Sequence, residues 1–226
     1  MTVAESNLAL VVLTFVLGLP VDQHGGLAGQ LAVSVWTWAL FFRLVRTSPA
    51  GWRLPFYACI AWATAGEVFL SLVWGLYTYR LGNIPPFIPP GHVLLFYLGL
   101  VLAPRVPGAF VALVPAAAVG YAAFAWLHGI DTVSVLLTGL FVVCMLQAGG
   151  RRLYAVMFVA ALAVELYGTW MGNWVWHAEV PYLGFDSANP PLAAGAFYCA
   201  LDVLVGITSR GLRRAHSYAA KAEAVC

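Results

Sequence analysis

Three carboxyl-bearing residues lie deep inside apolar stretches of the sequence: Glu67, Glu165 and Asp202. Each lies 11 or 12 residues from the end of its apolar run, which at about 1.5 Å per helical residue is a depth of roughly 16–18 Å. An acidic side chain at the centre of a bilayer costs about 2.5–3.5 kcal/mol, so it is expected to face the interior of a helix bundle. Apolar burial and neighbouring carboxylates both favour the protonated form. The three residues therefore predict proton-transfer chemistry in one membrane-embedded site.

Two other interpretations of these acids stay open. The carboxyls can be structural and form hydrogen bonds between helices, and Asp202 in particular lacks a counterpart in the first half of the chain. They can also form a proton or cation pathway through the bundle. Against a pathway, no apolar segment contains a Lys or Arg as counter-charge.

Aromatic residues gather near the outer ends of the two segments that carry the glutamates. They are Trp74, Tyr77, Tyr79, Trp170, Trp174 and Trp176. Aromatic faces stabilise cations, so this set is predicted to bind the substrate and to stabilise a carbocation above the acids. For Tyr79 and Trp176, a position in the aromatic belt at the membrane interface explains the sequence equally well.

Two proline-rich loops follow the aromatic residues. "GNIPPFIPPGH" and "DSANPP" bring Asn83 and Asn189 to the mouth of the bundle, where the loops are predicted to fold as lids because proline lowers the entropy lost on ordering. His92 is placed to relay protons, or it is simply a polar residue at a helix start. His177, Glu179 and Asp186 suggest a loop network, since their irregular spacing argues against a zinc site.

The composition indicates the environment in which these residues act. With 62% apolar and 9% charged side chains, the chain lacks the polar surface of a water-soluble globule and is predicted to be a polytopic membrane protein. The net charge of +2, spread over short loops, excludes a nucleic-acid partner. No basic residue precedes Arg43, so the first apolar segment is predicted to be retained as a helix rather than cleaved as a signal. The cysteines are predicted to be free thiols at Cys59, Cys144, Cys199 and Cys226.

The apolar segments predict an all-α transmembrane bundle that forms a single domain over 1–226. About eight helices are expected, or seven if the first does not span. Their ranges are 4–21, 27–45, 55–79, 90–104, 107–127, 132–148, 153–173 and 190–209. With the N-terminus inside, ten of the eleven basic residues are cytoplasmic and only Arg80 lies outside. Basic loops stay on the cytoplasmic side, so both termini are predicted to be cytoplasmic in a bacterial inner membrane.

The chain also repeats itself. The segments 53–79 and 152–176 both begin Arg-Leu, reach a glutamate 14 and 13 residues after that Arg, and close on an aromatic pair before a proline-rich loop. This order predicts a four-plus-four tandem repeat, with halves of about 1–105 and 106–210 and a cytoplasmic tail over 211–226. Glu165 is then the copy of Glu67.

The pattern resembles known isoprenoid-processing membrane enzymes. A glutamate in one helix and an aspartate in the last, without a metal motif, resemble the membrane-bound terpene cyclases. "IPPGHVLLFYLG" (88–99) is similar to the P-x-E-E-x-x-x-F stretch of the lycopene cyclase domain, although Gly91 and His92 replace the two acids. "GNWVW" with "NPP" is similar to membrane carotenoid hydratases. The resemblance implies Glu67 and Asp202 as an acid/base pair.

The sequence therefore predicts a cofactor-independent isoprenoid or terpenoid enzyme, a cyclase or hydratase. Its expected partners are a hydrophobic isoprenoid-like molecule and the lipid bilayer, and no oligomeric state is indicated. No nucleotide-binding, hydrolase or metalloprotease motif is present, and neither a cofactor nor a metal is expected. The alternative function is a small proton-coupled transporter or lipid-binding protein, because repeats with a midplane site suit a transporter equally well.

Overall fold

The computed structural model describes residues 2–147 and 149–223, with side chains as far as Leu212. Cys226 lies outside the described residues, as do the side chains of Arg213, Arg214 and Lys221 in the predicted tail. The helical elements are α1 (Val3–Thr47), α2 (Ala50–Glu67), a π-helical turn η1 (Val68–Val73), α3 (Ile88–Leu102), a 3₁₀ turn η2 (Ala103–Arg105), α4 (Gly108–His128), α5 (Val133–Met145), α6 (Arg151–Met171) and α7 (Gly195–Glu223). The strands are β1 (Tyr77–Tyr79) and β2 (Trp174–Trp176).

The chain is mostly helical, as the sequence predicts. Five helical segments in the described part are long and apolar enough to cross a bilayer: Val3–Thr47, Ala50–Val73, Ile88–Arg105, Gly108–His128 and Arg151–Met171. Large apolar side chains lie on the outer surface, among them Leu127, which is 80% exposed, and Leu72, which is 61% exposed. A surface of this kind is expected where lipid replaces water as the solvent.

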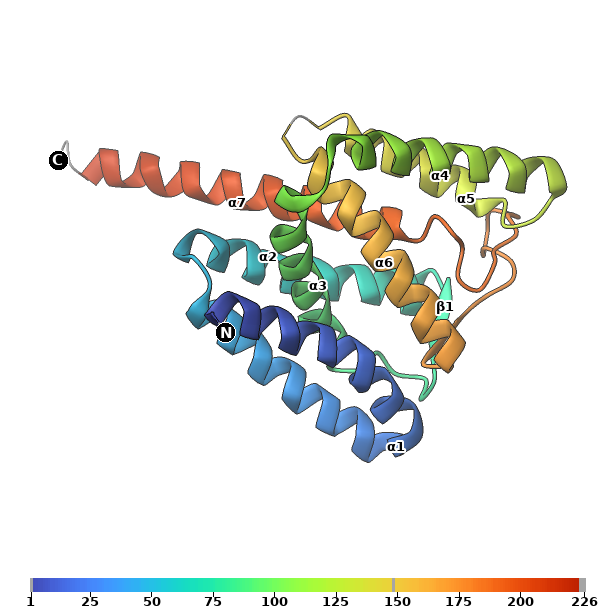
Figure 1. Cartoon of the computed structure of the whole chain (residues 1–226), viewed down its shortest axis with the longest axis horizontal. Helices are drawn as coiled ribbons and strands as arrows, with labels where there is room; N and C mark the ends of the chain where they lie inside the picture. Colours follow the sequence, from blue (N-terminus) through green and yellow to red (C-terminus); the bar gives the residue numbers. More distant parts are fainter. Residues whose placement is uncertain (1, 148, 224–226) are drawn as a thin grey trace.

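The predicted count of eight helices is not what the structure shows, since the described residues form seven α-helices. The predicted helices 4–21 and 27–45 are two arms of α1, which fold back at Gly26, a residue with a φ of 57°. The arms lie side by side (Figure 1), and the indole Nε1 of Trp36 donates to Thr14 Oγ1 at 2.8 Å between them. Glycine adopts this left-handed backbone at little cost, so one residue is enough to reverse the chain.

Four helices form the centre of the molecule. α2 packs against α3 and α7, and α6 packs against the same two helices, so that α2 lies diagonally opposite α6. The α1 hairpin covers α3 and the neighbouring part of α6, whereas α4 and α5 pack on α6 and α7 (Figure 1). α3 is the most enclosed, since every residue from Val93 to Tyr97 is buried, as expected of a helix that is apolar on all sides.

The aromatic segments are not helical, contrary to the predicted helix 55–79. α2 ends at Glu67, the π-helical turn follows, and Gly75 with a φ of 75° turns the chain back into β1. In the second half, Gly172 with a φ of 81° ends α6 just before β2, the usual role of glycine after a helix. β1 and β2 pair antiparallel, with Tyr77 opposite Trp176 and Tyr79 opposite Trp174.

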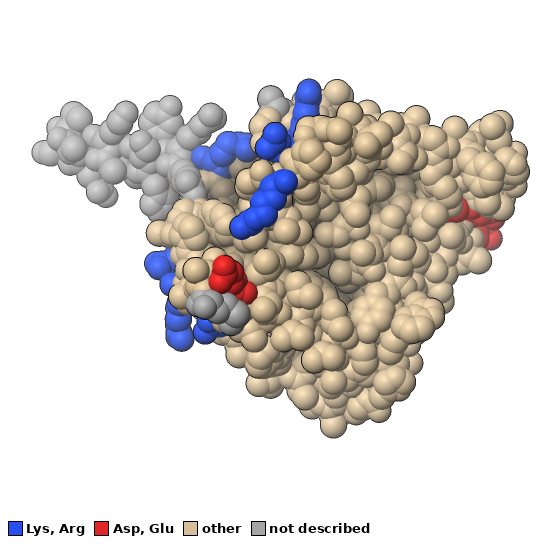
Figure 2. Space-filling view, viewed as in Figure 1, with Lys and Arg blue, Asp and Glu red and all other residues tan. Residues whose placement is uncertain are grey.

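The two ends of the molecule differ in their charged side chains. The start of α1 and the end of α7 lie at the same end (Figure 1), and most of the basic side chains in view gather there (Figure 2). Arg80 lies at the opposite end, where its guanidinium is 3.4 Å from the buried Asp22 carboxylate and donates to the Asp22 carbonyl at 2.6 Å. The side chain of Asn173 also donates to Asp22, at 2.7 Å, so this cluster ties both β-strand segments to the bend of α1.

Candidate active site

Glu67 is held by the first β-strand. Tyr77 and Tyr79 both donate their phenolic hydroxyls to Oε2 of Glu67, at 2.9 and 2.6 Å. Residues two apart on a strand face the same side, which places both phenols on one carboxyl. Burial, followed by the adjacent Glu67, raises the pKa of both tyrosines well above the usual value, so the phenols keep their protons.

His92 completes this first carboxyl site. Its Nδ1 lies 3.0 Å from the carbonyl oxygen of Ile88, and its Nε2 lies 3.5 Å from Oε1 of Glu67. A carbonyl only accepts, so Nδ1 carries a hydrogen, and a neutral ring then points its lone pair at Glu67. Nε2 of His92 and Oε1 of Glu67 thus face each other at a distance across which a proton can be passed.

Glu165 is held in a corresponding way by the second strand. The indole Nε1 atoms of Trp174 and Trp176 donate to Oε2 at 2.9 and 3.1 Å, and the hydroxyl of Tyr198 donates to Oε1 at 2.9 Å. An indole can only donate, so Oε2 is fixed as an acceptor. Three donors on one carboxyl stabilise its ionised form, whereas burial favours the protonated form, so Glu165 is a buried carboxyl with a full set of hydrogen-bond donors.

The two carboxyl sites meet along the axis of the bundle. The ring of Tyr77 lies 4.8 Å from that of Trp176, and the ring of His92 stacks on Tyr198 with centroids 4.9 Å apart and planes 11° from parallel. Each carboxyl therefore has its own donors, while the donors of the two halves pack against each other.

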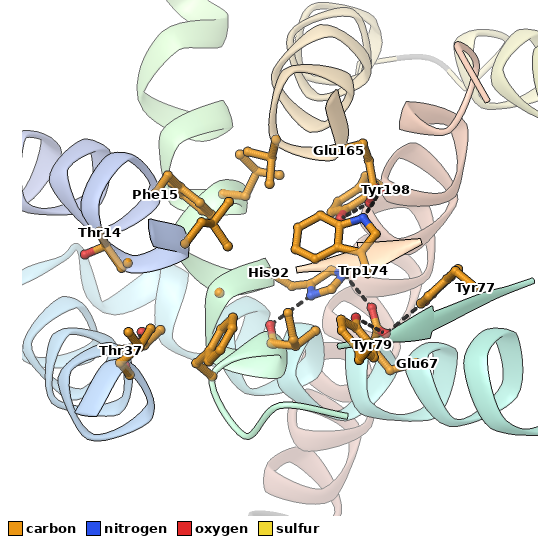
Figure 3. A pocket seen from close by; sticks show the side chains of 18 residues that line it. Thr14, Phe15, Thr37, Glu67, Tyr77, Tyr79, His92, Glu165, Trp174 and Tyr198 are labelled. Carbon is orange, nitrogen blue, oxygen red and sulfur yellow. Dashed lines mark hydrogen bonds and ion pairs between the residues drawn. The ribbon is translucent and has the colours of Figure 1, made fainter. Parts of the chain in front are cut away.

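Two cavities flank the carboxyl pair. The first chamber lies between α3 and α6 beneath the α1 hairpin (Figure 3). The second chamber lies between α2 and α7. The residues that line both chambers are Glu67, Tyr77, His92, Glu165 and Tyr198. Apart from this shared partition and a few α1 threonines, the linings are mainly apolar or aromatic.

The chamber walls come from corresponding positions in the two halves of the chain. On α3, the first chamber is lined by Ile88, Gly91, His92 and Leu95. The second is lined by Ala194, Phe197, Tyr198 and Leu201, each 106 positions later (88 to 194, 91 to 197, 92 to 198, 95 to 201). Val164 and Glu165 of α6 likewise match Gly66 and Glu67 of α2, 98 positions earlier. The chambers are thus related by an approximate twofold axis through the stacked rings.

Most of the predicted site residues come together in this structure. The residues that meet at the partition or in the chambers are Glu67, Tyr77, Tyr79, His92, Glu165, Trp174 and Trp176. Tyr79 and Trp176 are each 6% exposed and donate to carboxyls, so neither belongs to an interfacial belt. Trp176 reaches Glu165 from a strand, and not from the same face of a helix as its spacing suggested.

Asp202 is not part of this group. It lies one helical turn beyond Tyr198, lines neither chamber, and is 4% exposed. Neither carboxyl oxygen has a hydrogen-bond partner among the described residues. The three acids therefore do not form one site as predicted, because equal depth in the membrane does not set the direction in which a side chain points.

Four other predicted substrate-binding residues lie outside the two chambers. Trp170 is 78% exposed, since five residues turn it about 140° away from Glu165 on the helix. Trp74 lines a separate apolar cavity beside α5 and donates to the carbonyl of Pro181 at 3.1 Å. Asn83 donates to Gln30 of α1 at 3.0 Å. Asn189 accepts the backbone N–H of Trp176 at 2.9 Å, so it positions a strand and lines neither chamber.

Sequence reasoning missed two parts of the site. Tyr198 binds Glu165 and stacks on His92, and its position in the second half matches that of His92 in the first, which was a usable signal. The α1 residues Phe15, Gly18, Val33 and Thr37 also line the first chamber. They lack a motif, and only the folding-back of α1 onto α3 brings them there.

Comparison with protein-family models, with curated proteins and with solved structures finds no match to this chain. The chemistry of the two chambers is therefore the basis for a function. What the arrangement offers is a facing Glu67 and His92, a buried carboxyl with three donors at Glu165, and aromatic faces around mainly apolar space.

Proposed function

We propose that the chain is a cofactor-independent membrane enzyme that cyclises or hydrates an isoprenoid-like alkene or epoxide by proton-initiated carbocation chemistry. The observation that carries the proposal is the pairing of the facing Glu67 and His92 with a three-donor carboxyl at Glu165, both beside mainly apolar chambers. An apolar chamber admits a hydrocarbon and excludes most water, and electrostatic interactions are strong in such surroundings.

In the first step, the Glu67–His92 pair donates its proton to one carbon of the double bond or to the epoxide oxygen. In an alkene, the π electron pair forms the new C–H bond and positive charge develops on the neighbouring carbon. In an epoxide, an oxygen lone pair binds the proton, and the C–O bond breaks with its electron pair going to oxygen, so that positive charge develops on that carbon. The faces of Tyr79 and Trp174 line the first chamber and stabilise this charge through their quadrupoles.

In the second step, Glu165 acts as the base. For cyclisation, the π electrons of a second double bond in the substrate attack the cation and close a ring, and the Glu165 carboxylate removes a proton from a carbon next to the new cation, which gives a cyclised alkene. For hydration, the carboxylate removes a proton from a water that adds to the cation, which gives an alcohol. The proton then returns from Glu165 to the Glu67–His92 pair, so the reaction consumes no external proton. Asp202 has no part in these steps.

The proposal extends to the architecture. The corresponding chamber walls and the paired strands support a duplicated four-plus-four origin in which α4 and α5 correspond to the two arms of α1. The gathering of arginines at one end supports a bacterial inner-membrane protein with both termini in the cytoplasm.

Isotope incorporation tests the proposed reaction. The full chain in membrane nanodiscs is incubated in D₂O with linear isoprenoid alkenes and epoxides, and the extracted lipids are analysed by mass spectrometry. From an alkene we expect a cyclised or hydrated product that carries deuterium at carbon, and from an epoxide a cyclised or hydrated alcohol without deuterium at carbon. Both products should be absent with Glu67→Gln. If no substrate is altered while unchanged molecules accumulate in vesicles under a proton gradient, the chain is a transporter and the enzyme proposal is wrong.

The transporter alternative has a specific observation in its favour. The carboxyl pair lies between two chambers on opposite sides of the bundle axis, as expected of a site with alternating access. The uptake measurement above decides between the two functions, since a cyclase or hydratase changes its substrate whether or not a gradient is present.

A further inference from the structure

The second chamber has no role in the chemistry described so far, because a short alkene in the first chamber already contacts both carboxyls. Yet the second chamber reaches the same carboxyl pair from the other side of the bundle axis. It is lined by Ala63, Leu70, Phe197 and Leu201 in addition to the shared residues. Its chemistry therefore also suits a hydrocarbon.

We infer that one elongated hydrocarbon occupies both chambers, with its reacting group beside Glu67 and Glu165 and one arm in each chamber. The inference rests on the proposed function and specifies its substrate class: a linear polyisoprenoid whose reacting double bond is internal, not terminal. The approximate twofold relation between the chamber walls supports this, since corresponding positions provide similar surroundings for chemically similar arms.

The bound chain must pass the partition between the chambers. Across the bundle axis this partition consists of the stacked rings of His92 and Tyr198, which come from different helices and have no covalent link. A ligand that crosses here brings its central carbons next to the shared proton and next to the Glu165 carboxylate. In a ligand held in one chamber, the reacting carbons meet the carboxyls from one side only.

Two glycines allow each chamber to be filled separately. Gly91 of α3 lines the first chamber and Gly66 of α2 lines the second, and a Cβ added at either would meet nothing within 4 Å. Gly91→Leu and Gly66→Leu therefore reduce one chamber each without a backbone clash. Gly120→Leu is the matched control, because Gly120 lies exposed on α4 and its added Cβ is equally free.

Binding is measured with two probes and needs no turnover. The purified full chain in detergent is equilibrated with squalene, a long linear polyene, or with farnesene, which is half as long, and the bound hydrocarbon is quantified by gas chromatography after gel filtration. For the wild type we expect one squalene or two farnesene molecules per chain. Each chamber-filling variant should bind squalene at least about tenfold more weakly, the size of effect that a methylene-sized misfit produces in an apolar pocket. Each should also bind one farnesene, while Gly120→Leu behaves as the wild type.

The inference is wrong if only one of the two leucine variants weakens squalene binding, since the long probe would then lie in one chamber. Tryptophan fluorescence and monodispersity establish that the variants fold. If a leucine variant misfolds, Gly91→Ala and Gly66→Ala provide the same comparison with a smaller loss, and unchanged squalene binding in both overturns the inference. Binding as expected without any product in D₂O would instead refute the proposed function and leave the ligand class standing.

Discussion

The two carboxyl sites share a geometry but differ in the chemistry of their donors. Glu67 is surrounded by two phenols and an imidazole, groups that both donate and accept hydrogen bonds. Glu165 is held by two indoles, which only donate, and by one phenol. The first set allows a proton to arrive and leave, whereas the second fixes a carboxylate. In the proposed mechanism, this difference in donors assigns the acid to Glu67 and the base to Glu165.

The largest expected effect is on product formation, where substitutions of Glu67 and Glu165 should have different consequences. Glu67→Gln removes the shared proton and should lower product formation by about 10²–10⁴-fold, the usual contribution of general acid catalysis. Glu165→Gln still accepts from both indoles and should lower the rate less, while changing the ratio of products because the base is lost. Initial rates and product distributions in isolated membranes measure both. Equal losses with unchanged product ratios would remove the distinction between the two sites.

A second comparison uses two isosteric substitutions. Tyr198→Phe removes a hydrogen bond to the Glu165 carboxylate and should lower the free energy of unfolding by about 1.5–3 kcal/mol. Tyr77→Phe leaves Tyr79 and the shared proton on Glu67 and should cost about 0.5–1.5 kcal/mol. Denaturant unfolding in matched detergent micelles gives both values. The reverse order would show that Glu67 carries the more firmly held charge.

The third prediction contrasts the bonded carboxyls with the unbonded one. Asp202→Ala should raise the free energy of unfolding by about 1–3 kcal/mol, since neither carboxyl oxygen has a partner and burying an unpaired polar group is costly. Product formation should be retained. The thermal midpoint and the rate are measured on the same preparation, with Glu165→Gln as the control that should lose stability. Loss of activity on Asp202→Ala would return this residue to the catalytic group.

The smallest effect concerns alkaline pH. Burial and Glu67 raise the pKa of Tyr77 and Tyr79 in the folded state, so their stabilising contribution is complete below the unfolded value of about 10 and is lost as pH rises above it. The Tyr77→Phe, Tyr79→Phe double variant should lose stability less steeply above that pH than the wild type. Thermal midpoints across the alkaline range test this, and parallel curves would mean that these phenols titrate normally.

The sequence by itself determined the membrane environment and the pairing of Glu67 with Glu165. Charge and apolar length located most helical segments to within a few residues, because a bilayer demands uninterrupted apolar runs. The helix predicted over 55–79 ends at Glu67, and the one predicted over 190–209 extends over Gly195–Glu223. The ordered match between the halves indicated that the two glutamates correspond. The sequence also contained a period-two signal, aromatic residues on either side of one residue in "YTY" and "WVW", which indicates a strand. If these segments are taken as helix ends, the aromatic residues are expected to lie above the acids. In the structure they lie against them.

Only the tertiary structure decided which acids share a site. Asp202 lies at a depth along its helix similar to that of the two glutamates. Depth alone does not set the direction in which a side chain points, because that direction also depends on how the helix is rotated relative to its neighbours. The same rotation turns Trp170 outward and brings Tyr198 onto His92. The α1 hairpin covers the first chamber because Gly26 reverses the chain, and the second chamber lies between α2 and α7, which pack directly against each other. Side-chain direction in a bundle depends on which helix faces pack together, and that is a property of all the helices at once.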